Sequence, residues 1–417
     1  MRELDIGVAG CGIGGLAAAL ILARDGHRVS LYERFEAPRP VGSGLMIQPT
    51  GLAVLDRLGL AAPLAAAADP IERLFGRAEP SGRVVLDVRY EWLRRPGARG
   101  FGVHRSTLFD ILHRAVAGEG IAVDTGRTVT GREGQRLLFA GGARSPPHHL
   151  LVDALGAASP LVGEPARPLA YGALWASLDW TDGFDPAALE QRYRRANVMT
   201  GVLPIGLAPG SRRRQAAFFW LLRGDRLSAW RERGLEAWKE EVRALWPATA
   251  PLLDQIESAD RLAFARYAHR TLGEPAGSGL VHIGDSWHST SPQLGQGANM
   301  ALLDAWALAM ALREEESVEA ALHRAVALRR SHVRLYQALS ALFTPAYQSD
   351  SRLLPWIRDR IVPPFGRVWP ATRIQAEMVA GTFGGPLERL GLEFPLDALP
   401  SPERSVTPVT GRPQANG

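Results

Sequence analysis

A glycine-rich turn near the start of the chain constrains the fold more than any other feature. Residues 10–15 read Gly-Cys-Gly-Ile-Gly-Gly, after an alternating apolar segment at 4–9. An apolar helix-like segment follows at 16–24, and a second strand-like segment occupies 27–33. A bare G-x-G-x-x-G match is weak, but between a strand and a helix within about thirty residues it is specific. The sequence therefore predicts a β-turn-α-β unit that opens an α/β fold and binds a dinucleotide.

Each of three glycines in this turn has its own expected role. Gly10 permits a tight turn, Gly12 lets the backbone approach a pyrophosphate, and Gly15 lets the helix pack closely on the strand. The helix N-terminus offers N–H groups and partial positive charge to phosphates. Glu33 ends the second strand, where its carboxylate can accept hydrogen bonds from a ribose diol and disfavours a 2′-phosphate. We therefore expect FAD or NAD at this first site; the alternative is a glycine-rich turn without a ligand.

A second segment, residues 284–299, indicates the same kind of ligand. A buried-type strand at 280–283 runs into Gly284-Asp285, and a loop then leads to an apolar helix expected over 299–312. Asp285 can bind sugar-type hydroxyls, and the glycines at 295 and 297 let the loop backbone lie against a flat ligand. The helix N-terminus would stabilise the negative charge of a reduced flavin. The alternative is a sharp turn that caps a core helix.

With residues 103–108 (VHRSTL) and 42–49 (GSGLMIQP), these segments resemble the FAD-dependent aromatic hydroxylases. These are the single-component (group A) flavoprotein monooxygenases of the para-hydroxybenzoate hydroxylase fold. The resemblance covers roughly residues 4–345. It implies a Rossmann-like, discontinuous FAD-binding domain, an inserted α+β substrate domain of mixed sheet, and a C-terminal helical extension with a tail. The implied ranges are 1–71, 98–165 and 270–345 for the first, 72–97 and 166–269 for the second, and 346–417 for the third.

The resemblance also assigns roles by motif position. Glu33 would hold the adenosine ribose, Arg105 would lie along the FAD, and Asp285 would contact the ribityl–pyrophosphate stretch. Pro292 and residues 295–299 would lie at the isoalloxazine ring. The expected cofactor-binding residues are Gly10, Gly12, Ile13, Gly14, Gly15, Glu33, Arg34, Gly44, Leu45, Gln48, Arg105, Asp285, Pro292, Gly295, Gln296, Gly297, Ala298 and Asn299.

One segment departs from the family pattern. Members usually carry an Ala-Asp-Gly-x-x-Ser-like stretch, often with arginine before the serine, which serves FAD and the nicotinamide donor. Here the acid is replaced by Leu155 and the arginine by Ala158. Asp153 is two residues earlier, on the same side of a strand as Leu155, and could partly replace the missing acid. The departure is either drift at a tolerant position or the mark of an enzyme that no longer takes hydride efficiently from NADPH.

The activity that the resemblance implies is oxygen insertion. Family members use a flavin C4a-hydroperoxide, formed after NAD(P)H reduces the flavin, to hydroxylate or epoxidise a hydrophobic small molecule, here aromatic or polyketide-like. The catalytic residues are not identified. Candidate wall residues of the substrate pocket are Trp175, Tyr193, Phe218, Trp220, Tyr267 and His288, with His104 as a further possible base. Each aromatic candidate also has an alternative as ordinary core, and each histidine as a structural hydrogen-bonding group.

Two rival functions follow from the same residues. One keeps FAD without oxygenation, as an oxidase or a redox-neutral cyclase or isomerase, and is motivated by Leu155 and Ala158. The other is a non-catalytic flavin-binding or interaction protein, which the intact glycines at 295 and 297 disfavour.

Composition excludes several other classes. Lysine and arginine number 48 against 43 acidic residues, a net charge of +5, but Lys239 is the one lysine and the arginines are scattered. This pattern does not predict a nucleic-acid partner. A single cysteine, Cys11, excludes an intrachain disulfide framework and favours a reducing compartment. Motifs for metals or nucleoside triphosphates do not occur, so we expect no metal.

The N-terminal apolar run at 13–23 mimics a signal peptide, but it contains patterned glycines and lacks a cleavage site. No stretch reaches the roughly 18 uninterrupted apolar residues of a membrane span. We therefore expect a cytoplasmic monomer or homodimer whose partners are a small-molecule substrate and molecular oxygen.

Overall fold

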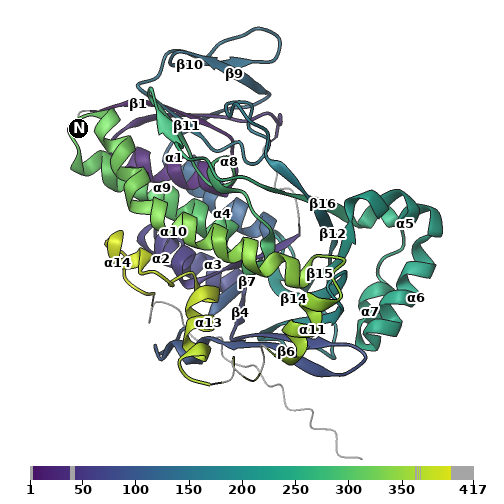
Figure 1. Cartoon of the computed structure of the whole chain (residues 1–417). Coiled ribbons are helices and arrows are strands. Elements are labelled where there is room, and N and C mark those ends of the chain that lie inside the picture. The colour runs from purple at the N-terminus through teal and green to yellow at the C-terminus, as the bar shows by residue number, and fades with distance from the viewer. Residues whose placement is uncertain (1–2, 38–42, 362–363, 365, 367, 396–417) are drawn as a thin grey trace, which may run out of the picture.

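The computed structural model describes residues 3–37, 43–361, 364, 366 and 368–395. Of the segments discussed above, Gly42 and the tail 396–417 lie outside these residues. Two large sheets organise the chain (Figure 1), and helices cover them. The expected α/β fold with a second, mixed sheet and a helical C-terminal region is confirmed.

The first sheet carries the glycine turn on its central strand. Its order is β17-β18-β11-β1-β2-β8, and β1 pairs in parallel with β2 on one side and β11 on the other. A central parallel strand is buried on both faces, and Ile6 and Val8 are fully buried. The strands are β17 (Ala276–Gly277), β18 (Leu280–His282), β11 (Leu150–Asp153), β1 (Asp5–Ala9), β2 (Arg28–Tyr32) and β8 (Ala122–Asp124).

Long apolar helices pack beside this sheet. Helix α1 (Ile13–Arg24) starts directly after Gly12 and packs against α4 (Arg105–Gly118) and α9 (Gly297–Glu314). Helix α9 begins two residues before the expected start at Asn299. Helix α10 (Val318–Tyr347) packs along α9 and runs toward the second sheet (Figure 1). The remaining helices here are α2 (Pro49–Arg57), α3 (Ala61–Ala67) and α8 (Asp285–His288).

The second sheet has seven strands in the order β16-β12-β15-β14-β13-β5-β6. All its pairs are antiparallel except β13 with β5. Its strands are β16 (Ala263–His269), β12 (Arg167–Asp179), β15 (Arg214–Arg223), β14 (Val198–Leu207), β13 (Ala188–Arg194), β5 (Arg73–Ala78) and β6 (Arg83–Arg89). All seven come from segments 72–97 and 166–269, although the domain division itself stays a prediction.

Helices cover one face of the second sheet, and the other face is directed at the rest of the chain. The covering helices are α5 (Leu227–Arg233), α6 (Leu235–Leu245) and α7 (Ala250–Leu253). Opposite them, Ser177 Oγ lies 2.8 Å from Ser43 Oγ, at the start of a small sheet of β3 (Gly44–Ile47), β7 (Gly100–His104) and β4 (Asp69–Ile71). A hairpin of β9 (Val129–Glu133) and β10 (Arg136–Phe139) completes the strands.

The C-terminal region adds α11 (Leu353–Arg360), α13 (Ala371–Ala380) and α14 (Pro386–Arg389). Helix α11 lies at the far end of α10, and α14 packs on α2 and α10. Across the described residues, none of the helices combines the length and apolar character that a membrane span needs.

Candidate active site

The glycine turn is closed toward the protein and open on its other side. Gly10 has a φ of +102°, and a Cβ there would lie 2.7 Å from the Ala154 carbonyl oxygen. A Cβ on Gly15 would overlap the Gly10 carbonyl oxygen, so α1 sits directly on the strand. By contrast, a Cβ on the exposed Gly12 would meet nothing nearer than 4.0 Å. The first turn of α1 therefore presents bare backbone to an open side, as a pyrophosphate requires.

Glu33 lies directly beside this turn. Its carboxylate accepts hydrogen bonds from the backbone N–H of Cys11 at 2.9 Å and of Phe35 at 3.1 Å. These contacts fix the carboxylate at the edge of the turn, where a ribose would follow the pyrophosphate. Arg34 is exposed and its guanidinium lies 4.7 Å from the Phe35 ring centroid, while Ile13 is buried in the core.

The second segment meets the first through one alanine of α9. A Cβ on Gly14 would lie 3.2 Å from the Cβ of Ala301, and a Cβ on Gly284 would lie 3.0 Å from the same atom. The start of α9 also adjoins Asp285, since a Cβ on Gly297 would lie 4.0 Å from Asp285 Oδ1. Two segments far apart in sequence therefore converge, and the N-termini of α1 and α9 lie close together.

Charged groups surround Asp285 where the N-termini of α1 and α9 meet. Its side chain is accessible to solvent, yet the surrounding protein raises the pKa of its carboxyl, which His288 and Arg105 oppose. Arg105 begins α4, and its backbone N–H donates to the Ser43 carbonyl at 2.9 Å. His104 caps the same helix, accepting from Ser106 N–H at 3.2 Å, and burial lowers its pKa, so it acts there as a neutral acceptor.

His288 does not line a substrate site. Its Nε2 lies 2.6 Å from Asp304 Oδ2, and both side chains are 1 % exposed. Arg329 Nε donates to the other carboxylate oxygen of Asp304 at 2.8 Å. Burial by itself would raise the pKa of Asp304, but His288 and Arg329 hold it well below its usual range. The buried cluster formed by these three residues fixes α8, α9 and α10 together, so we withdraw His288 as a pocket candidate.

The amide side chains near the second segment are used to hold the backbone. Asn299 is fully buried; its Oδ1 accepts from Gln48 N–H at 2.8 Å, and its Nδ2 donates to the carbonyls of Met46 and Gly295 at 3.1 Å each. Gln48 Oε1 accepts from the hydroxyl of Tyr90. These side chains position the loop, and the surface left for a ligand is formed by exposed Pro292 and Gly297 with half-buried Ala298.

Gln296 points away from the expected ring site. Its Nε2 donates to the Val379 carbonyl of α13 at 2.6 Å, and the residue is buried. Gly44 likewise serves the packing of sheets, because a Cβ there would collide with Ile205 and lie 2.9 Å from the Cβ of Ala217. Leu45, its neighbour, is half-buried.

The aromatic candidates separate onto the two faces of the second sheet. Phe218 and Trp220 are on the helix-covered face, where both rings pack edge-on against Trp238, with centroids 6.1 and 6.3 Å away. That face is directed away from the glycine turn and its partners, so we withdraw both as wall residues. Trp175, Tyr193 and Tyr267 belong to the opposite face.

Two further residues, Phe219 and Gln191, lie on this opposite face and are absent from the candidates expected from the sequence. Phe219 packs on Trp175 with centroids 4.8 Å apart, and Gln191 Oε1 accepts from the Tyr193 hydroxyl at 2.6 Å. Alternation along 217–222 separates Phe219 from Phe218 and Trp220, but it does not tell which face meets the site.

Asp153 does not replace the missing acid at Leu155. It is fully buried, and its Oδ1 accepts from Leu155 N–H at 3.0 Å. Its Oδ2 accepts from Ser159 Oγ at 2.6 Å and lies 2.7 Å from His282 Nδ1. Since these contacts occupy both carboxylate oxygens within the core, Asp153 acts as a structural group. The expectation that it partly substitutes for the family acid is therefore withdrawn.

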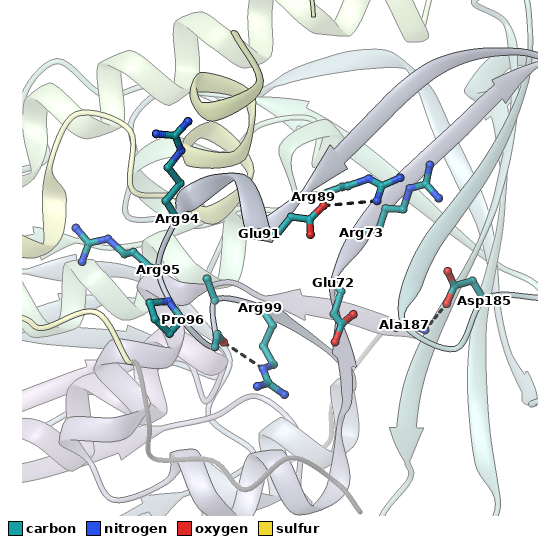
Figure 2. Close-up of a pocket in the computed structure, with 12 residues that line it drawn as sticks. Glu72, Arg73, Arg89, Glu91, Arg94, Arg95, Pro96, Arg99, Asp185 and Ala187 are labelled. Atoms are coloured by element: carbon teal, nitrogen blue, oxygen red, sulfur yellow. Dashed lines mark hydrogen bonds and ion pairs between the residues drawn. The ribbon is translucent and has the colours of Figure 1, made fainter. Parts of the chain in front are cut away.

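A separate pocket of about 780 Å³ lies at the edge of the second sheet (Figure 2). Arg73 is paired with Asp87 at 2.7 Å and Arg89 with Glu91 at 3.5 Å, while Arg94 points away from both. None of its lining residues belongs to the glycine-rich segments, so we assign it no part in flavin binding. Within the described part of the chain, no group of three or more His, Cys, Asp or Glu side chains could hold a metal ion.

The comparisons with known proteins agree with this geometry. Residues 3–134 match the family model described as an FAD binding domain. The 6-methylpretetramide 4-monooxygenase of Streptomyces rimosus is 30% identical over 392 residues, covering 90% of this chain and 88% of that protein. The aurachin C monooxygenase/isomerase of Stigmatella aurantiaca is 26% identical over 396 residues, covering 89% and 96%.

Solved structures share the fold. The tetrameric form of 2-methyl-3-hydroxypyridine-5-carboxylic acid oxygenase has a TM-score of 0.75 at 19% identity, covering 93% of this chain and 98% of that one. HpxO of Klebsiella pneumoniae in complex with FAD has a TM-score of 0.74 at 18% identity, covering 92% and 99%.

The fold and the converging helix N-termini define an FAD-binding oxidoreductase. The chain belongs to the single-component (group A) FAD-dependent monooxygenases of the para-hydroxybenzoate hydroxylase fold. FAD is its cofactor, and the open side at Gly12 and the accessible Asp285 fit that group.

Proposed function

We propose that this monooxygenase hydroxylates a neutral, planar aromatic small molecule and uses NADPH or NADH as its reductant. The observation that supports this substrate class is the lack of charge in the middle of the second sheet, on the face opposite helices α5–α7. The residues there are Ala173, Trp175, Gln191, Gly201, Phe219, Ala265 and Tyr267, and none of them is charged. A carboxylate substrate that contacted these seven residues alone would lose its hydration without gaining a cation, which is costly.

The polar groups on this face suit a substrate with a hydroxyl or carbonyl group. Tyr267 accepts a hydrogen bond from Trp175 Nε1 at 3.1 Å, so its own O–H is available to donate. Burial raises the pKa of Tyr267 to about 12, so it stays a protonated donor. Trp175 and Phe219 together supply an aromatic surface for stacking. Relatives named as a putative 2-heptyl-3-hydroxy-4(1H)-quinolone synthase and as a 6-methylpretetramide 4-monooxygenase support the same class.

Different residues are proposed to contact different parts of the FAD molecule. The turn at Gly12 would hold the pyrophosphate, Glu33 the adenosine ribose, Asp285 the ribityl stretch, and the loop 292–299 the isoalloxazine. When bound, FAD takes electrons from the reductant and delivers one oxygen atom of O₂ to the substrate. The N-terminus of α9 would stabilise negative charge on the reduced ring. The Trp175–Phe219 pair would orient the substrate and exclude water.

Leu155 and Asp153 together favour a second candidate, an FAD-bound oxidase or redox-neutral cyclase or isomerase that does not use NAD(P)H efficiently. Leu155 packs against apolar neighbours, and Asp153 is committed to the core. No acid is therefore offered at this position to a nicotinamide donor.

An anaerobic titration separates the two candidates. The purified yellow protein is mixed with NADPH or NADH and a neutral phenol or quinolone, and the visible flavin bands are followed. The variant Leu155→Asp/Ala158→Arg is treated alongside. Prompt bleaching of the wild type supports the monooxygenase, and product is then sought by mass spectrometry in air. Bleaching of the variant without that of the wild type supports the second candidate.

A cytoplasmic location, a monomeric or dimeric state and the lack of a nucleic-acid partner stay predictions from the sequence.

A further inference from the structure

The last turn of α13 is held by side chains from the flavin-binding part of the chain. Gln296 donates to the Val379 carbonyl at 2.6 Å, Thr50 to the Ala380 carbonyl at 3.4 Å, and Tyr336 to the Met378 carbonyl at 2.9 Å. The final carbonyls of a helix have no partner within the helix. Here separate elements supply those partners, so the end of α13 is docked at a defined position.

The lack of a side chain at Gly381 lets the end of α13 lie close to Thr50 and Gln296. The φ of Gly381 is +81°, and a Cβ there would overlap Thr50 Oγ1 and lie 2.8 Å from Gln296 Oε1. His332 Nε2 lies 3.0 Å from the Gly381 carbonyl oxygen. Burial and the neighbouring Arg329 hold the pKa of His332 well below its usual value, so a neutral ring accepts from Arg329 through Nδ1 and donates through Nε2.

The same contacts reach the loop expected at the isoalloxazine. Gln296 lies between Gly295, with a φ of +62°, and Gly297, which starts α9. On its other side the loop is tied to β3 and α2 by Asn299. The loop 292–299 is thus held from two directions, and one of the two contacts is with α13, a helix that follows the motif-bearing residues 4–345.

We propose that α13 is a brace of the flavin site and that Gln296 is the positioning residue through which it acts. The inference rests on the proposed placement of the isoalloxazine at the loop 292–299. Glycines flank Gln296 on both sides, so internal contacts such as the hydrogen bond from Asn299 Nδ2 to the Gly295 carbonyl leave the loop backbone in need of a further constraint. The hydrogen bond to Val379 supplies that constraint and sets where the ring meets the helix N-terminus.

Three variants of the full chain test this. Gln296→Leu removes the Nε2 donor to Val379, and Gly381→Ala displaces α13 without replacing any residue of the loop 292–299. Gly391→Ala is the matched control, because Gly391 also has a positive φ, +59°, but a Cβ there meets nothing within 4 Å. The readouts are FAD affinity by flavin fluorescence, the visible spectrum and the midpoint potential of the bound flavin.

The brace predicts that Gln296→Leu and Gly381→Ala each weaken FAD binding by about tenfold, the loss of one buried hydrogen bond. Both should also shift the flavin spectrum and potential, whereas the control matches the wild type. Wild-type affinity, spectrum and potential in Gln296→Leu would overturn the proposal, whether or not Gly381→Ala folds. The test needs only bound flavin and no turnover. A wild-type protein that binds FAD but hydroxylates no substrate would therefore refute the proposed function, and the effect of Gln296→Leu on FAD binding could still be measured.

Discussion

The buried cluster of His288, Asp304 and Arg329 yields the sharpest prediction, through the substitution Asp304→Asn. The change keeps the shape of the side chain but leaves the Arg329 guanidinium, 1 % exposed, without its counter-charge. Removing one partner of a buried ion pair costs about 3–5 kcal/mol, because the remaining charge is desolvated and uncompensated. Its second partner, His288, loses an anionic acceptor at 2.6 Å. We therefore expect the free energy of unfolding to fall by this amount.

Urea unfolding of the FAD-free protein at pH 7 measures the effect, with Asp254→Asn as control. Asp254 pairs with Arg243 at 2.9 Å but is 67% exposed, so its loss should cost less than about 1 kcal/mol. The pKa of Asp304 is depressed in the folded state, so its stabilisation is complete above the unfolded pKa of about 4 and is lost only as the pH falls toward the folded value. A variant within about 1 kcal/mol of the wild type at pH 7 would refute the reasoning.

Further predictions concern the two halves of the site. Gly12 has a φ of −70° and an open side, so Gly12→Val should leave the FAD-free protein as stable as the wild type but weaken FAD binding about ten- to hundredfold. Flavin fluorescence titration beside urea unfolding checks this, and unchanged affinity contradicts the placement of the pyrophosphate. Tyr267→Phe should raise KM for a neutral substrate about three- to tenfold with little change in kcat. Trp220→Phe, on the other face, should alter stability and not KM; equal KM effects from both would refute the assignment of faces. Since the pKa of Tyr267 is about 12, the wild-type KM should show no step near pH 10, where an ordinary tyrosine ionises.

The local parts of the site could be predicted from the sequence. The turn at Gly10, the start of α1 and the position of Glu33 depend on residues within about thirty positions of one another, as backbone conformation and strand alternation dictate. The apolar run of α9 and the Gly284-Asp285 turn belong to the same kind of local information, since φ values above zero favour glycine. The resemblance then supplied the relation between these segments.

Only the tertiary structure decided which face of a strand is buried and which distant partner each polar side chain contacts. Alternation on β15 puts Phe218 and Phe219 on opposite faces, but only the packing of α5–α7 shows that Phe218 lies under the helices and Phe219 on the opposite face. Asp153 and His288 are polar residues in motif segments, and their partners Ser159 and Asp304 come from the folded contacts. Gln296 points to α13, more than eighty residues later in the chain. The direction of a side chain depends on which distant element packs beside it, and a sequence pattern of period two or 3.6 carries no information about that partner.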